Sequence, residues 1–185
     1  MPPGTIDTTN GTFTNNGFIV GTGHITGKVS GSGYIAPGQS AGGFTIDGHL
    51  THDGGGHEIE LGGHFHGDGD KSLTEFDWLD VTGNVELAGA LNVYLIDSFE
   101  LLAGMSFKIL HVGGTLTGQY DGLPDGALVG TYSGTDLFIT YFGGDGNDIT
   151  LFSRAVPEPS TLLMAMTALA VLVVFGTKRS RNPVA

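Results

Sequence analysis

Histidine and aspartate side chains, which can bind metal ions, gather in one short stretch of the chain. His57, His64 and His66 lie close together in the sequence, among several aspartates. If His64-Phe65-His66 forms a strand, both imidazoles project from one face, because successive side chains of a strand alternate. His57 would then supply a third ligand for zinc or copper. The alternative is a polar loop with solvated histidines, and we favour it because nothing in the sequence fixes the orientation of the rings.

A second candidate is the run Gly143-Gly144-Asp145-Gly146-Asn147-Asp148-Ile149-Thr150-Leu151. It is similar to the calcium-binding nonapeptide G-G-x-G-x-D-x-U-x, in which U is a large apolar residue. The eighth position is Thr150, however, and the pattern occurs once, whereas calcium ligation needs stacked copies. We therefore predict a glycine-aspartate turn that leads into the last strand.

Carboxylates also invite comparison with the acid–base pairs of enzymes that cleave polysaccharides. The candidates are Asp68, Asp70, Asp77 and Asp80. A lyase also needs clustered Lys or Arg to bind its uronate substrate, and few basic residues are available here. Trp78, the only tryptophan, is either a platform for sugar stacking or a core anchor, and core anchors are commoner. We expect no enzymatic activity and no resident cofactor, with calcium or zinc binding as the alternatives.

Acidic side chains far outnumber basic ones before the C-terminal tail. All 19 Asp and Glu residues lie at or before Glu158, so residues 1–159 carry a formal charge of −15; the opposing basic residues are Lys28, Lys71, Lys108 and Arg154. Such a body repels nucleic-acid phosphates and anionic lipid head groups. We expect no nucleic-acid partner, and cations or neutral or basic polymers, extracellular polysaccharide among them, fit better.

The sequence predicts that short strands position these candidate residues. Glycine accounts for 33 of the 185 residues, and between residues 10 and 38 small turn residues surround apolar ones that recur every 4 to 7 positions: Phe13, Phe18, Ile25, Val29 and Ile35. This spacing is too short for ordinary hairpins and is typical of the rungs of a solenoid. Farther on, apolar and polar residues alternate, as in 91–95, which indicates half-buried strands.

We therefore predict an all-β fold for an extracellular domain at residues 1–155. Its first fifty residues form a right-handed parallel β-solenoid of short rungs punctuated by Gly and Asn, which merges into a sandwich-like closure. Runs such as Phe44-Thr45-Ile46-Asp47-Gly48 and Leu79-Asp80-Val81-Thr82-Gly83 resemble the β-solenoid passenger segments of autotransporters. The resemblance covers roughly residues 10–152 and implies a surface protein.

Residues 156–185 have a different composition. Val156-Pro157-Glu158-Pro159-Ser160 precedes an apolar run at 162–175, and the basic residues Lys178, Arg179 and Arg181 follow. Proline is excluded from a helix interior and Ser160 is a good N-cap, so we predict a transmembrane helix at about 160–177. The basic cluster stops this helix on the cytoplasmic side. A buried helix of a soluble domain is the alternative, and apolarity on all sides argues against it.

These three parts together resemble the PEP-CTERM sorting signal of Gram-negative bacteria. The resemblance implies that Pro157, Glu158 and Pro159 are recognised by an exosortase, a membrane-embedded cysteine transpeptidase that cleaves near the motif. It also implies an exported protein with an intermediate anchored in the inner membrane, which is then passed to the cell surface or extracellular matrix.

The first residues depart from this pattern, since exported proteins of this kind begin with a signal peptide. Met1-Pro2-Pro3-Gly4-Thr5 has no charged n-region and no apolar h-region. We expect the sequence to be a fragment, or its start to be misplaced, with the N-terminus of the domain truncated.

The sequence thus favours a non-enzymatic exported surface or matrix protein, structural or adhesive and associated with biofilm. The alternative is a carbohydrate- or metal-binding surface module that uses residues 57–78, and an enzyme acting on polysaccharide comes third.

Overall fold

The computed structural model describes residues 4–156 of the chain, and this part is all-β, as predicted. The strands in chain order are β1 (Thr5–Thr14), β2 (Phe18–Gly21), β3 (His24–Gly31), β4 (Tyr34–Pro37), β5 (Gly43–Asp47), β6 (Leu50–His52), β7 (Gly56–Leu61), β8 (Trp78–Val81), β9 (Val85–Leu87), β10 (Ala90–Leu95), β11 (Ser106–Val112), β12 (Leu116–Gly118), β13 (Leu128–Tyr132), β14 (Thr135–Gly143) and β15 (Asp148–Ala155). The one helical element among the described residues is the 3-10 turn η1 (Gly67–Gly69).

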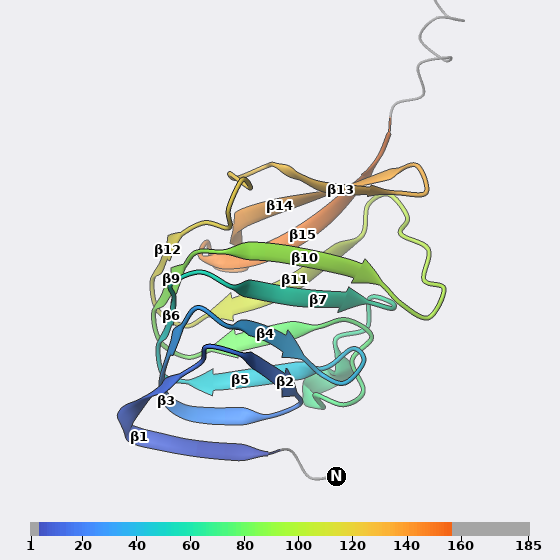
Figure 1. Ribbon diagram of the computed structural model, residues 1–185. Coiled ribbons are helices and arrows are strands. Elements are labelled where there is room, and N and C mark those ends of the chain that lie inside the picture. Colours follow the sequence, from blue (N-terminus) through green and yellow to red (C-terminus); the bar gives the residue numbers. More distant parts are fainter. Residues whose placement is uncertain (1–3, 157–185) are drawn as a thin grey trace, which may run out of the picture. The chain divides into compact units, whose positions relative to one another are not determined.

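Strands from β1 to β12 pair in parallel and form three stacks. The first joins β1, β3, β5, β8 and β11, and the second joins the far halves of β1 and β3 to β6, β9 and β12. The third joins β2, β4, β7 and β10. Figure 1 shows the strands lying one above another from β1, in blue, towards β13 and β14, in orange. Parallel pairing therefore continues to residue 118, well beyond the first fifty residues for which the sequence predicted it.

The register of these strands lines up apolar side chains inside the stacks. In the first stack Ile25 pairs with Ile46, Ile46 with Val81, and Val81 with Val112. All four side chains are fully buried. Because alternate residues of a strand face opposite sides, the side chains between them face outward. The period-two pattern in the sequence thus becomes a continuous core.

The C-terminal strands close the body with antiparallel pairing. β15 lies between β11 and β14 and pairs antiparallel with both, and β13 pairs antiparallel with β14. Ile139, Leu151 and Phe107 are aligned across these strands and fully buried. This closure extends the larger, curled sheet, whereas the sequence predicted a sandwich-like arrangement.

The chain divides into two units, Met1–Ala155 and Val156–Ala185. Within residues 4–156 no helix is long and apolar enough to cross a membrane. The predicted transmembrane helix at 160–177 lies outside the described residues.

Candidate functional site

The strand that leads into the predicted sorting segment is held firmly in the sheet. β15 ends at Ala155, and Val156 is the last described residue. Near this end the Arg154 guanidinium lies over the stacked rings of Phe138 and Phe152, 5.5 and 5.0 Å from their centroids. The sorting segment therefore leaves from an ordered strand. The other motif residues, Pro157, Glu158, Pro159 and Ser160, and the basic residues Lys178, Arg179 and Arg181 lie outside the described part of the chain.

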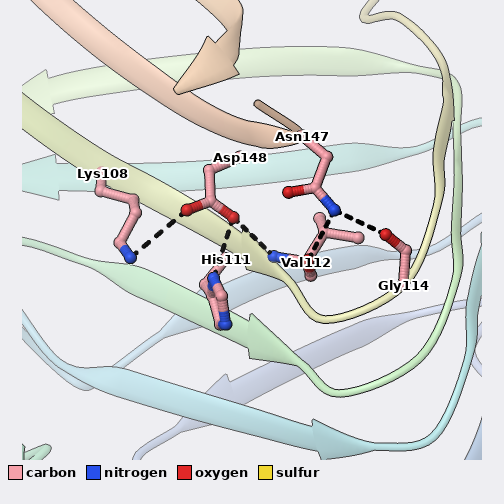
Figure 2. Close-up of polar contacts among 6 residues, drawn as sticks. All are labelled: Lys108, His111, Val112, Gly114, Asn147 and Asp148. Atoms are coloured by element: carbon pink, nitrogen blue, oxygen red, sulfur yellow. Dashed lines mark hydrogen bonds and ion pairs between the residues drawn. The ribbon is translucent and has the colours of Figure 1, made fainter. Parts of the chain in front are cut away.

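A buried carboxylate stands where the parallel stack meets the antiparallel closure (Figure 2). Asp148, the first residue of β15, is only 1% exposed. Its Oδ1 accepts hydrogen bonds from Val112 N and His111 Nδ1, both at 2.9 Å, and its Oδ2 lies 3.4 Å from Lys108 Nζ. Both oxygens of Asp148 are thus occupied by groups of β11, so this carboxylate joins β15 to β11.

Asn147 extends this contact to the next turn, as Figure 2 also shows. Its Nδ2 donates to the carbonyl oxygens of Val112 at 2.9 Å and Gly114 at 2.5 Å. The run that is similar to a calcium nonapeptide therefore forms the turn between β14 and β15, as we predicted. Among residues 4–156 no group of three or more His, Asp or Glu side chains is arranged to hold a metal ion.

The three histidines of the predicted metal site are not brought together. His57 is buried in β7, whereas His64 and His66 are exposed in the loop between β7 and β8. Residues 64–66 lie outside any strand, in a loop as the favoured interpretation held, and Glu75 Oε2 accepts hydrogen bonds from the backbone N–H groups of His64 and Phe65.

Trp78 packs in the core, which is the commoner of the two roles that the sequence allowed. The residue is 8% exposed, and its ring stacks on the His66 imidazole with centroids 4.7 Å apart. A side-chain carbon at Gly43 would overlap this ring, so the glycine makes room for it. Partial burial against Trp78, followed by the positive charge of Lys108, lowers the pKa of His66. The indole face is therefore covered and unavailable for sugar stacking.

Among the candidate acids, Asp77 is hydrogen-bonded to backbone N–H groups. It is 1% exposed, and its oxygens accept hydrogen bonds from Gly42 N at 2.7 Å and Glu60 N at 2.8 Å. Burial raises the pKa of Asp77 to about 8, although both hydrogen bonds favour the charged form. Asp68 and Asp70 are exposed, and Asp70 accepts hydrogen bonds from Ser72. Asp77 thus connects the loop before β5 to β7.

Sequence reasoning missed a chain of buried polar rings. His52 Nε2 lies 3.2 Å from His57 Nε2, and His57 Nδ1 makes a short hydrogen bond with the Tyr120 hydroxyl. The exposed fractions are 4% for His52 and 2% for the other two. His57 pairs with Ile35 and Leu91 in the inward column of the third stack. The alternation of His57 with Ile59 and Leu61 was the signal that could have placed this histidine inside.

Burial changes the acidity of all three groups. It lowers the pKa of His52, where the Gly54 carbonyl and Asp53 act in the opposite direction. Burial, with the neighbouring His52, holds the pKa of His57 well below its usual value. Burial, together with Tyr141, raises the pKa of Tyr120 well above its usual value. Each group is thus favoured in its neutral form.

Comparison with known families assigns the C-terminal segment. Residues 155–180 match the PEP-CTERM protein-sorting motif. The predicted PEP-CTERM sorting motif is confirmed, and the transmembrane helix stays a prediction. This motif implies export, processing by an exosortase and membrane-anchored sorting to the cell surface. No curated protein and no solved structure matches the chain. The resemblance of the body to autotransporter passengers therefore stays a prediction.

Proposed function

We propose that this chain is a non-enzymatic surface or extracellular-matrix protein with a structural or adhesive role in biofilm. The observation that carries this proposal is the sorting motif at residues 155–180, which directs a protein outside the cell through an exosortase. The cleavage and transfer chemistry belongs to the exosortase, and Pro157, Glu158 and Pro159 are its recognised substrate. After sorting, the body is the part that acts in the extracellular space.

The parallel stacks support a structural role for the body. Interpreted as an autotransporter-like, right-handed solenoid, β1 to β12 form successive turns of one coil, in which each turn buries its apolar side chains against its neighbours. The buried carboxylates Asp77 and Asp148 are both occupied by backbone N–H groups. Carboxylates held in this way serve cohesion, which favours a scaffold over an acid–base catalyst.

A second candidate function is carbohydrate binding, and a groove on the outer side of the second stack favours it. The groove encloses about 490 Å³, and its polar lining includes Lys28, His49, Asn84 and Glu86. Side chains of adjacent strands repeat there at about 4.8 Å. Such a row of hydroxyl, amide and charged groups suits an extended, hydroxyl-rich polymer and lies apart from the stretch 57–78 that the sequence suggested.

Sorting is tested by following the chromosomal gene product in an exosortase-containing Gram-negative host. An epitope inserted between Asp97 and Ser98, in an exposed turn, reports its location. We expect surface or released protein from the parent gene, and retention in the inner membrane when Pro157-Glu158-Pro159 becomes Ala-Ala-Ala or when the exosortase is deleted. Surface delivery that persists in both cases would contradict exosortase sorting.

The structural role is tested by biofilm mass and matrix retention. A deletion of the gene should reduce both, and the parent gene should restore them, whereas the tri-alanine variant should not. Carbohydrate binding is tested on a panel of neutral and acidic polysaccharides with Glu86→Ala, against Asp145→Ala as a control in an exposed turn outside the groove. Binding that both variants retain equally would remove the groove from consideration.

A further inference from the structure

The outer face of the closing strands β13, β14 and β15 carries a row of large apolar side chains. Figure 1 shows these strands together at the end of the body opposite β1. Leu128 pairs with Phe138, and Phe138 pairs with Phe152, so the three residues lie side by side across the strands. Leu128 is 49% exposed, and the two stacked phenylalanine rings are half-buried. Because alternate residues of a strand face opposite sides and Leu137 and Leu151 fill the core side, this row faces away from the core.

A positively charged side chain stands at the edge of this row. Arg154 follows Phe152 by two residues on the same face of β15, and its guanidinium covers the rings of Phe138 and Phe152. Asp136 is its neighbour on β14, but Asp136 Oδ1 accepts a hydrogen bond from the Thr131 hydroxyl at 2.6 Å. Within the described part of the chain Arg154 forms no ion pair. The N–H groups of this exposed guanidinium are therefore available to an anion.

The chain that leads from this face to the apolar run of the sorting segment is short. Val156 is the last described residue, and the apolar run begins at Leu162, six residues later. Six residues span at most about 21 Å even when fully extended. The head-group layer on one side of a bilayer takes up roughly 5–7 Å of this length. While the sorting segment is anchored in the membrane, the end of β15 is therefore held within about 15 Å of the lipid head groups.

We propose that Leu128, Phe138, Phe152 and Arg154, together called the β15 face, contact the phospholipid head-group layer while the protein is anchored for sorting. The apolar side chains leave water for the boundary between head groups and acyl chains, and the guanidinium donates to lipid phosphate groups. This inference deepens the proposed function and rests on the membrane-anchored sorting that the motif at 155–180 implies.

The charge of the rest of the body favours this face as the point of contact. Residues 1–159 carry a formal charge of −15, from 19 acidic and four basic residues, so anionic head groups repel most of the surface. Of the four basic residues, Arg154 is the one nearest to the sorting segment along the chain. The short connection limits the distance to lipid in every anchored molecule, with or without an exosortase, which favours lipid as the partner. The contact brings the start of the sorting segment to the membrane surface, where a membrane-embedded exosortase acts.

Fluorescence quenching by brominated lipids tests this contact. Full chains that carry Leu128→Trp are reconstituted into vesicles of phosphatidylethanolamine and phosphatidylglycerol, with or without bromine on the acyl chains, and vesicle-bound protein is isolated by flotation. The parent chain supplies the baseline, because its single tryptophan, Trp78, is buried. The matched control is Phe18→Trp, since Phe18 is 63% exposed on β2, which belongs to the other sheet.

We expect brominated lipid to quench the added fluorescence of Leu128→Trp, and to quench Phe18→Trp no more than the parent. No quenching of Leu128→Trp, or equal quenching of both variants, would overturn the lipid contact. Quenching of Leu128→Trp that appears only after exosortase is added to the vesicles would assign the face to the enzyme and would also overturn it. Sorting is judged separately by the variants of residues 157–159, so a failure of this inference is distinguishable from a failure of the proposed function.

The contribution of Arg154 is measured in the Leu128→Trp chain. One basic side chain near an anionic leaflet strengthens membrane binding about fivefold, so Arg154→Gln should lower the ratio of quenched to unquenched protein by about that factor. Lys28→Gln removes an exposed positive charge on β3, away from the β15 face, and should leave the ratio unchanged. Equal losses in the two variants would overturn the specific contact of Arg154 with lipid.

A measurement on the unaltered chain guards against variants that fail to fold. In the same vesicles, a lipid with a spin label on its head group should broaden the NMR signals of the Phe138 and Phe152 rings more than those of Phe18. Equal broadening of all three rings would contradict the contact of the β15 face with the membrane.

Discussion

Replacement of Asp148 by alanine is expected to loosen the joint between the parallel stack and its antiparallel closure. The change removes the acceptor of the buried Val112 N–H group, and a stranded donor costs about 1–3 kcal/mol. It also removes the ionic partner of Lys108 and His111, whose side chains are 42% and 41% exposed and can turn to water. These pairs add less than about 1 kcal/mol. We expect a total loss of about 1–4 kcal/mol in the free energy of unfolding.

Two further variants separate the causes of this loss. Asp148→Asn keeps an oxygen that can accept from Val112 N–H and removes only the charge, so it should cost about 1 kcal/mol. Asp145→Ala alters an exposed residue of the same turn and should stay within about 0.5 kcal/mol of the parent. The order of destabilisation is therefore Asp148→Ala, then Asp148→Asn, then Asp145→Ala.

The assay is urea unfolding at pH 7, followed by the fluorescence of Trp78. This single tryptophan is buried in the folded body and becomes exposed on unfolding. If Asp148→Ala and Asp148→Asn lose the same stability, the charge matters and the Val112 hydrogen bond does not. If Asp148→Ala is as stable as the parent, the reasoning about the joint is refuted.

Three more predictions concern single positions. The folded-state pKa of Asp77 is raised to about 8, above its unfolded value of 3.8. The protonated side chain therefore contributes stability that is fully present below about pH 3.8 and is lost as the pH rises through 8. Urea midpoints should show this loss in the parent and not in Asp77→Asn. In the folded protein, the fluorescence of Trp78 should be quenched below about pH 6.5 as the stacked His66 becomes protonated. The variant His66→Gln should remove this quenching. The same pH dependence of the fluorescence in His66→Gln and in the parent would contradict the stack. Gly56→Ala should destabilise the body by more than about 2 kcal/mol in thermal unfolding. The reason is that Gly56 has φ +150° and that a side-chain carbon there would overlap the Ala90 carbonyl group. A variant as stable as the parent would contradict this close approach.

Much of the fold could be predicted because the side-chain pattern and the strand geometry have the same period. Ile25, Ile46 and Val81 are surrounded by glycine and polar residues, and all three lie inside the first stack. The extent of parallel pairing could not be predicted, because it is set by contacts between residues such as Thr51 and Glu86, which lie more than thirty positions apart. A local pattern carries no information about such distant partners.

The site illustrates the same limit. The turn at 143–148 followed from its glycines, yet no local pattern indicates that Asp148 contacts His111. Nothing in the sequence around His52 marks it as buried, and the structure places it against His57, which in turn contacts the remote Tyr120. The alternating pattern at 64–66 was too short to distinguish a strand from a loop, and the favoured loop is what the structure has.

The position of β15 also has a mechanical consequence. A surface protein held through its C-terminal segment transmits any pull from flow or from a neighbouring cell into the end of β15 at Ala155. This strand is bonded on both sides, to β11 and to β14. A force along β15 must break its hydrogen bonds to both neighbouring strands at the same time. This requires a larger force than the removal of an edge strand, whose hydrogen bonds break one after another. The C-terminal segment thus follows an interior strand of the sheet.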